Sequence, residues 1–190
     1  MKRKPSKIPV FLTLKEITTL FEGAVKFQDE ILIKTLFYFG LRVTEGVTPR
    51  HTDFLWKEKI PHIKFENSKG KKERRMPIPA IFFEKLKKWS EINKNTEYLF
   101  CNSQGMHLSR QTAWKIIKLA AAKSSLTKQI HPHTLRHSNA TAIYERTGDL
   151  LVTSEPLGHS DLKTTTIYAK CTDLRKQQAI RDVFRWVGLV

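Results

Sequence analysis

Cysteine is scarce in this sequence. The 190 residues include two cysteines, Cys101 and Cys171, which lie far apart and form no C-x-x-C pair. A zinc site built on four cysteines is therefore excluded, and one built on paired cysteines and paired histidines lacks its spacing. No disulfide framework is indicated, and a reducing cytoplasm fits the composition.

Long hydrophobic runs and acidic residues are also scarce. No apolar run approaches the roughly 18 residues of a membrane span, and the apolar stretch after the basic N-terminus is too short for a signal peptide. Lys and Arg number 34 against 18 Asp and Glu, so the formal net charge is +16. Because no long amphipathic helix carries this charge on one face, we expect nucleic acid rather than a membrane as the partner.

Hydrophobic residues make up 40% of the chain, and most of them follow a helical period. We expect helical segments in the ranges 13–23, 27–39, 80–92, 109–123, 131–148, 150–157, 161–169 and 173–187. Short apolar segments separated by charged turns within 51–79 indicate a small antiparallel sheet. The predicted fold class is mainly α with a small three-stranded antiparallel sheet, in one domain that follows a basic arm at residues 1–12.

The same patterns predict helix ends and inward-facing side chains. Thr13 and Ser109 are expected to cap helices at their N-termini, and Gly148 to end one. Pro156 is expected to break or kink the helix before His159. The apolar side chains expected on inner helix faces are Leu14, Ile17, Phe21, Ile81, Leu86, Trp89, Trp114, Ile117 and Ala121.

A cluster of histidines surrounds an arginine at residues 131–138, HPHTLRHS. His133 and His137 lie four residues apart, which suits a metal site on a helix. The same cluster with Arg136 equally suits a phosphate site. The spacing alone leaves both readings open, and other segments decide between them.

Two further motifs flank this cluster, one before it and one after it in the sequence. Their order and their distances from the cluster are those of one protein family. They are GLRVTEG at residues 40–46 and LGHSDLKTTTIYAK at residues 157–170. Over roughly residues 10–175 the sequence resembles the catalytic domain of the tyrosine recombinases, the phage integrase family, with Xer-type recombinases among its members. SKGKKERRMPIP, at residues 68–79, is similar to that family's lysine-bearing β-hairpin.

The chemistry of DNA strand exchange explains why such a site needs these residue types. Tyrosine oxygen can attack a phosphodiester and keep its bond energy in a phosphotyrosine. Guanidinium groups match the charge on the non-bridging oxygens. The resemblance implies that Tyr168 is the nucleophile and that Arg42 and Arg136 bind the scissile phosphate. The histidine cluster then reads as part of a phosphate site, and no metal or other cofactor is expected.

The resemblance also implies roles for supporting residues. His133 would be a general base or phosphate ligand, and His159 would donate a hydrogen bond to the phosphate. Lys69 would be the general acid, with Lys71 and Lys72 as nearby rivals that are also expected to bind DNA. Glu45 and His137 would orient these groups. The remaining histidines, His51, His62, His107 and His131, match nothing in the family pattern.

Function and partners follow from the resemblance as expectations. We expect a site-specific recombinase that acts on double-stranded DNA with inverted-repeat sites through a 3′-phosphotyrosine and forms a tetramer in the synaptic complex. It would be a cytoplasmic protein, either associated with the nucleoid or encoded by a virus or mobile element. Residues 13–172 would form the catalytic domain and residues 173–190 a helix that packs on a neighbouring protomer. We expect this sequence to lack the N-terminal core-binding domain of many relatives, either because it is a trimmed chain or because it is a naturally short member similar to the fimbrial invertases. The side chains expected along the DNA-facing side of the helix at 109–123 are Arg110, Gln111, Lys115 and Lys118.

Alternative functions use a similar fold. A type IB topoisomerase or a telomere resolvase carries a similar set of site residues, and it relaxes or resolves DNA without exchanging strands between two sites. A non-catalytic DNA-binding protein could also have this fold, although such a protein is expected to lack the tyrosine or an arginine, and this sequence lacks neither.

Overall fold

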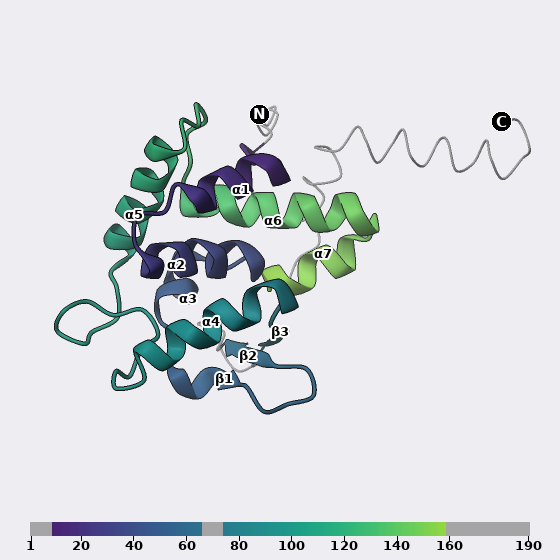
Figure 1. Ribbon diagram of the computed structural model, residues 1–190. Coiled ribbons are helices and arrows are strands. Elements are labelled where there is room, and N and C mark those ends of the chain that lie inside the picture. Colours follow the sequence, from purple (N-terminus) through teal and green to yellow (C-terminus); the bar gives the residue numbers. More distant parts are fainter. Residues whose placement is uncertain (1–8, 66–73, 159–190) are drawn as a thin grey trace, which may run out of the picture.

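The structure is a computed structural model, and it describes residues 9–65 and 74–158 (Figure 1). The helices are α1 (Leu14–Glu22), α2 (Phe27–Tyr38), α3 (Val43–Val47), α4 (Ala80–Ile92), α5 (Arg110–Lys123), α6 (Pro132–Thr147) and α7 (Leu150–Leu157), with a 3₁₀ turn η1 (His51–Asp53). The strands are β1 (Phe54–Leu55), β2 (His62–Phe65) and β3 (Arg74–Pro77). They form one antiparallel sheet in the order β1-β2-β3, so the predicted fold class is confirmed.

Helix α2 is the centre of the helical part. Its sequence is apolar almost all round, which predicts a helix covered on every side. Ile31, Leu32, Ile33 and Leu36 are fully buried. In Figure 1 α2 runs between α6 and α4, and it contacts both of them as well as α1, α3 and α5. The core therefore fixes α3 and α6, which carry the residues of the first two motifs.

The sheet places alternate residues against the core. Ile63 and Phe65 of β2 are buried, and they stand opposite Met76 and Arg74 of β3. Met76 is also buried, whereas Arg75 between them is exposed. Because side chains alternate along a strand, Arg74 shares the inward face with Met76.

The predicted helix ends are confirmed. The Thr13 hydroxyl accepts from the backbone N–H of Glu16, and Ser109 Oγ accepts from the N–H of Thr112 at 3.0 Å. Gly148 ends α6 with φ 68°, a left-handed conformation that favours glycine. These local signals do not depend on the rest of the fold, which explains why the sequence alone located them.

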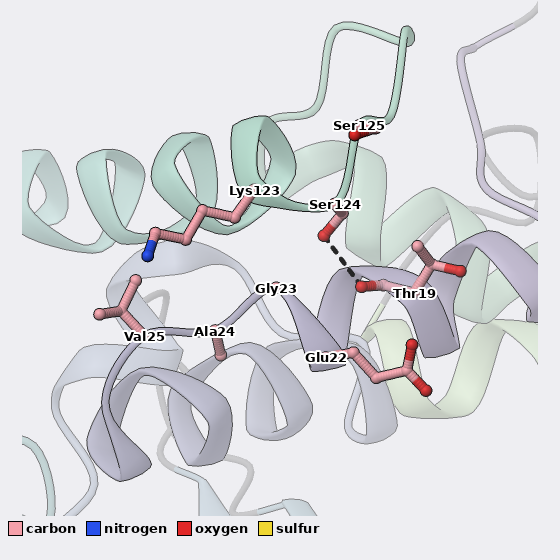
Figure 2. Close-up of a pocket in the computed structure, with 8 residues that line it drawn as sticks. All are labelled: Thr19, Glu22, Gly23, Ala24, Val25, Lys123, Ser124 and Ser125. Atoms are coloured by element: carbon pink, nitrogen blue, oxygen red, sulfur yellow. Dashed lines mark hydrogen bonds between the residues drawn. The ribbon is translucent and has the colours of Figure 1, made fainter.

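The far end of α5 is held against the end of α1 (Figure 2). Ser124 Oγ donates to the carbonyl of Thr19 at 2.9 Å. A Cβ added to Gly23 would lie 2.0 Å from Ser124 Oγ and 2.3 Å from the carbonyl oxygen of Ala120, so only glycine fits this close approach. The shallow pocket beside it, which Lys123 also lines, lies at the end of α5 opposite to Arg110.

Some expectations about helix faces and helix ends were wrong. Leu14 is 64% exposed and Ile81 is 82% exposed, because each lies in the first turn of its helix beside the buried stripe rather than on it. The buried face of α4 begins at Phe82 instead. Helix α7 runs through Pro156 and ends at Leu157, with Gly158 as its left-handed C-cap. A proline there removes one backbone hydrogen bond, and the helix ends one residue later, so no further turn has to continue past it.

None of the helices within the described ranges has both the length and the apolar composition that crossing a membrane requires.

Candidate active site

Arg42 and Glu45 lie at the start of α3 and bind each other twice. Glu45 Oε1 accepts from Arg42 Nη1 at 2.9 Å, and Glu45 Oε2 accepts from the Arg42 backbone N–H at 2.9 Å. A carboxylate three residues into a helix is well placed for the second bond, since the first backbone N–H groups have no partner within the helix. Glu45 is 10% exposed and the Arg42 side chain 43%, so the carboxylate holds the guanidinium at an open surface.

Arg136 of α6 reaches the same place from below the surface. It is 4% exposed, and its Nη1 donates to the carbonyl of Gly40 at 2.6 Å. Nη2 donates to the carbonyl of Leu157 at 2.5 Å, at the end of α7. Nη1 also lies 4.0 Å from Glu45 Oε2. The two arginines therefore share one carboxylate, and the end of α7, directly before His159 in sequence, is tied to them.

His133 and His137 lie one turn apart on α6, on either side of Arg136 in sequence. His133 is exposed, and His137 is half-buried. Burial lowers the pKa of His137 below its usual 6.5, and the charges of His133 and Arg136 act in the same direction. A neutral imidazole at this position adds no further positive charge and keeps a lone pair for hydrogen bonding.

A groove of about 630 Å³ opens beside His133. Its lining is Val43, Arg110, Gln111, Trp114, Lys115, His131, Pro132 and His133. Three of the four side chains of α5 that were predicted to bind DNA thus lie next to the arginine and histidine motifs. The fourth, Lys118, has its Nζ 5.2 Å from the centre of the Trp114 ring.

Trp114 was expected in the core, and that expectation was wrong. It is 43% exposed and lies parallel to the His131 ring, with the ring planes 7° apart and the centres separated by 6.4 Å. Ala113, Ile117, Ala120 and Ala121 form the buried stripe of α5 instead. Sequence reasoning therefore missed both Trp114 and His131 as walls of the groove.

Arg74 is the other residue that the sequence did not single out. Its side chain is 11% exposed, and Nη2 lies 3.8 Å from Glu45 Oε2. In sequence it stands inside the basic run KGKKERR, which reads as a solvated turn. The alternation of β3 is the signal that could have found it, because Arg74 lies two residues before the apolar Met76.

Metal ligands do not gather in the part of the chain that the structure describes. Across residues 9–65 and 74–158 no three His, Cys, Asp or Glu side chains lie close enough to hold an ion. His51 and His62 form hydrogen bonds with Ser90 and Glu58, each at 2.9 Å, and His107 with the carbonyl of Leu108 at 2.9 Å. These three histidines have local partners outside the arginine site.

Comparison with known proteins identifies the family. The model of the phage integrase family matches residues 11–175. The chain belongs to the phage integrase family. A tyrosine recombinase of Thermosipho africanus is 35% identical over 181 residues, which cover 93% of this chain and 62% of the relative. Tyrosine recombinase XerD of Staphylococcus saprophyticus is 37% identical over 190 residues, with 94% and 62% covered. The chain thus spans 62% of the length of these relatives.

A solved structure agrees with the family assignment. The crystal structure of the XerH site-specific recombinase, bound to a palindromic difH substrate in a post-cleavage complex, superposes with a TM-score of 0.81. The match covers 92% of this chain and 53% of XerH, at 26% identity. The prediction of a tyrosine recombinase catalytic-domain fold is therefore confirmed.

The structure brings together the members of the predicted phage integrase site that it describes. Arg42 and Arg136 meet at Glu45, where the start of α3 approaches α6, and His133 and His137 flank Arg136 on α6. The remaining predicted site residues lie outside the described residues, and their roles stay predictions: Lys69, Lys71, Lys72, His159 and Tyr168. The predicted C-terminal helix at 173–187 also lies outside them.

Proposed function

We propose that this chain is the catalytic domain of a site-specific DNA recombinase. It cuts one strand of duplex DNA through Tyr168, which becomes joined to the 3′ phosphate and releases a 5′ hydroxyl. A 5′ hydroxyl of a partner duplex then attacks the phosphotyrosine and releases the tyrosine. The phosphodiester energy is kept throughout, so the reaction needs no ATP. In this proposal the guanidinium groups of Arg42 and Arg136 supply the positive charge that a metal ion could otherwise supply.

The observation that carries this proposal is the shared carboxylate of Arg42 and Arg136. Both guanidinium groups come within 4.0 Å of Glu45, and two backbone carbonyls hold Arg136, one from Gly40 between α2 and α3 and one from Leu157 at the end of α7. Groups that are fixed before the substrate arrives stabilise the transition state without further reorganisation. A phosphate bound here receives two charge-assisted donors from different elements, as phosphoryl transfer requires.

The groove beside His133 supports DNA as the ligand. Arg110 and Lys115 supply positive charge on one side of it, and the formal net charge of the chain is +16. In our proposal the start of α5 enters the major groove, where Arg110 and Gln111 read base edges and the lysines contact phosphates. XerH binds a palindromic DNA substrate. By analogy we place this chain on inverted repeats of cytoplasmic DNA, as a tetramer when two sites are joined.

A nicked duplex tests the proposal directly. Cleavage beside a nick releases a short fragment that diffuses away, so the covalent protein–DNA product accumulates. The substrate is a library of nicked duplexes with a randomised site, and the reaction contains EDTA. The product is then separated under denaturing conditions. The wild-type chain should form a covalent product that carries a free 5′ hydroxyl at the cut, and Tyr168→Phe should form none. Binding without any covalent product would favour the non-catalytic alternative.

A second assay separates recombination from the topoisomerase alternative. Plasmids that carry one or two copies of the recovered site are incubated with the protein. A recombinase exchanges strands between two sites, whereas relaxation of a one-site plasmid without exchange on the two-site plasmid would favour a type IB topoisomerase.

A further inference from the structure

Arg74 lies below the surface that Arg42 and Arg136 share. It begins β3, stands opposite Phe65 of β2, and its guanidinium carbon lies 5.5 Å from the centre of the Phe65 ring. The side chain is 11% exposed. Arg74 therefore brings a permanent charge into the apolar interior next to the site.

The guanidinium of Arg74 lacks ordinary compensation. Its Nε, Nη1 and Nη2 are buried, and none of them has a hydrogen-bond partner among the described residues. Burial lowers the pKa of Arg74, while the charge of Glu45, 3.8 Å away, acts in the opposite direction. A buried charge without hydrogen bonds destabilises a fold, so a reason other than stability is needed to explain Arg74.

The charges around Glu45 suggest that reason. Glu45 Oε2 lies 3.8 Å from Arg74 and 4.0 Å from Arg136, while the carboxylate also accepts two bonds from Arg42. Three guanidinium groups and one carboxylate carry a formal net charge of +2. Without Arg74 the carboxylate would cancel half of the charge that Arg42 and Arg136 present to a phosphate. The carboxylate is only 10% exposed, so water screens it weakly.

We propose that Arg74 is a positioning residue that neutralises Glu45 from beneath, so that Arg42 keeps both its direction and its full charge for a bound phosphate. The inference rests on the proposed function for the identity of that phosphate, a DNA phosphodiester. It adds to the proposed site a residue that does not touch the DNA itself. Glu45 can then hold Arg42 without repelling the anion.

Two variants and a neighbour test this role. Arg74→Met removes the charge and keeps most of the length of the side chain. Arg74→Lys keeps a positive charge at this position. Arg75→Met is the matched control, because Arg75 is the next residue of β3 and its side chain is 55% exposed beside Glu58. Each protein is melted with and without inorganic phosphate, and each is assayed for covalent product on the nicked duplex.

The expected results differ from those of a structural residue. Arg74→Met should keep or raise the melting temperature without phosphate, since it removes a buried guanidinium that makes no hydrogen bond to the described residues, while Glu45 keeps its two bonds from Arg42. Its gain from phosphate should be smaller than that of wild type and of Arg75→Met, because the general stabilisation by this salt is common to all three proteins and only binding at the site is weakened. Its single-turnover cleavage should be slower by about 10- to 100-fold, the range seen for outer-shell partners of metal ligands. Arg74→Lys should recover part of both losses.

Other results overturn the inference. A clear fall in the melting temperature of Arg74→Met, together with no recovery in Arg74→Lys, would assign Arg74 to the fold alone. So would equal phosphate gains and equal cleavage rates in wild type and Arg74→Met. If wild type forms no covalent product but the phosphate results hold, the proposed function fails and Arg74 still serves an anion site. If wild type cleaves and Arg74→Met cleaves equally, only the Arg74 inference fails.

Discussion

The guanidinium of Arg136 is bonded to the backbone of Gly40, 96 residues earlier in the sequence, with 2.6 Å between Nη1 and the carbonyl oxygen. Its other terminal nitrogen is bonded to Leu157. One buried side chain thus joins the segment before Arg42 to the segment before His159. The proposed phosphate site depends on this connection, whose contribution to stability can be measured.

Substitution of Arg136 by lysine should weaken the fold as well as the site. A single ammonium cannot reproduce two divergent bonds to carbonyls, so at least one buried carbonyl loses its charged donor. We expect Arg136→Lys to lower the free energy of unfolding by about 1.5–3 kcal/mol, the value of a hydrogen bond to a charged group. Urea denaturation measures this loss. Arg146→Lys, at an exposed position of the same helix, should change it little, and equal effects of the two variants would contradict our account.

Gly40 should be intolerant of alanine for two separate reasons. Its φ is 56°, which disfavours a side chain, and a Cβ would lie 2.6 Å from Asn139 Oδ1. Gly105 also has a positive φ, 77°, but its Cβ would meet nothing within 4 Å. Gly105→Ala should therefore lower the free energy of unfolding by the backbone strain alone, about 1–2 kcal/mol. Gly40→Ala should lower it by more. Thermal melts of both variants give the comparison, and an equal loss would show that Asn139 can move aside.

The two ends of α5 should differ in their contribution to DNA binding. Lys115 lines the groove beside His133, whereas Lys123 lines the pocket at the far end of the helix (Figure 2). We expect Lys115→Gln to lower the salt dependence of binding to any duplex by a slope of about 1, because one phosphate contact is lost. Lys123→Gln should leave the slope unchanged. Fluorescence anisotropy over a range of NaCl concentrations measures both, and the reverse order would place the DNA elsewhere.

Stability should fall in mild acid partly because of His137. Its pKa is below 6.5 in the folded chain, so the unfolded chain takes up the proton more readily. This contribution is fully present above the unfolded value and is lost as the pH falls through the folded value. His137→Gln should therefore reduce the fall in melting temperature between about pH 7.5 and pH 5. Burial also lowers the pKa of His51, so a smaller slope should remain. An unchanged slope in His137→Gln would contradict the burial of its neutral form.

The sequence predicted those parts of the fold that local signals determine. Caps at Thr13, Ser109 and Gly148 need only their neighbours in the chain, and the buried helix at 27–39 is apolar on all sides. The convergence of Arg42 and Arg136 followed from family motifs in a known order. Local pattern alone would not have brought together residues so far apart in the chain.

The sequence failed where the orientation of a single side chain decided the outcome. Trp114 looks like a core residue, yet the small residues of α5 fill the buried face and leave the ring beside His131. Arg74 looks solvated within its basic run, yet the pairing of β3 with β2 turns it inward. Both depend on which neighbour occupies the space, which is a property of the tertiary fold.

The most direct test of the proposed mechanism is to find the residue that becomes joined to DNA. Covalent product from the nicked duplex is formed in EDTA, digested with protease and nuclease, and analysed by mass spectrometry. Our account predicts a nucleotide joined through its 3′ phosphate to Tyr168, in a product that forms without ATP or divalent metal. A nucleotide on another residue, or cleavage that yields only free DNA ends and depends on metal, would contradict it.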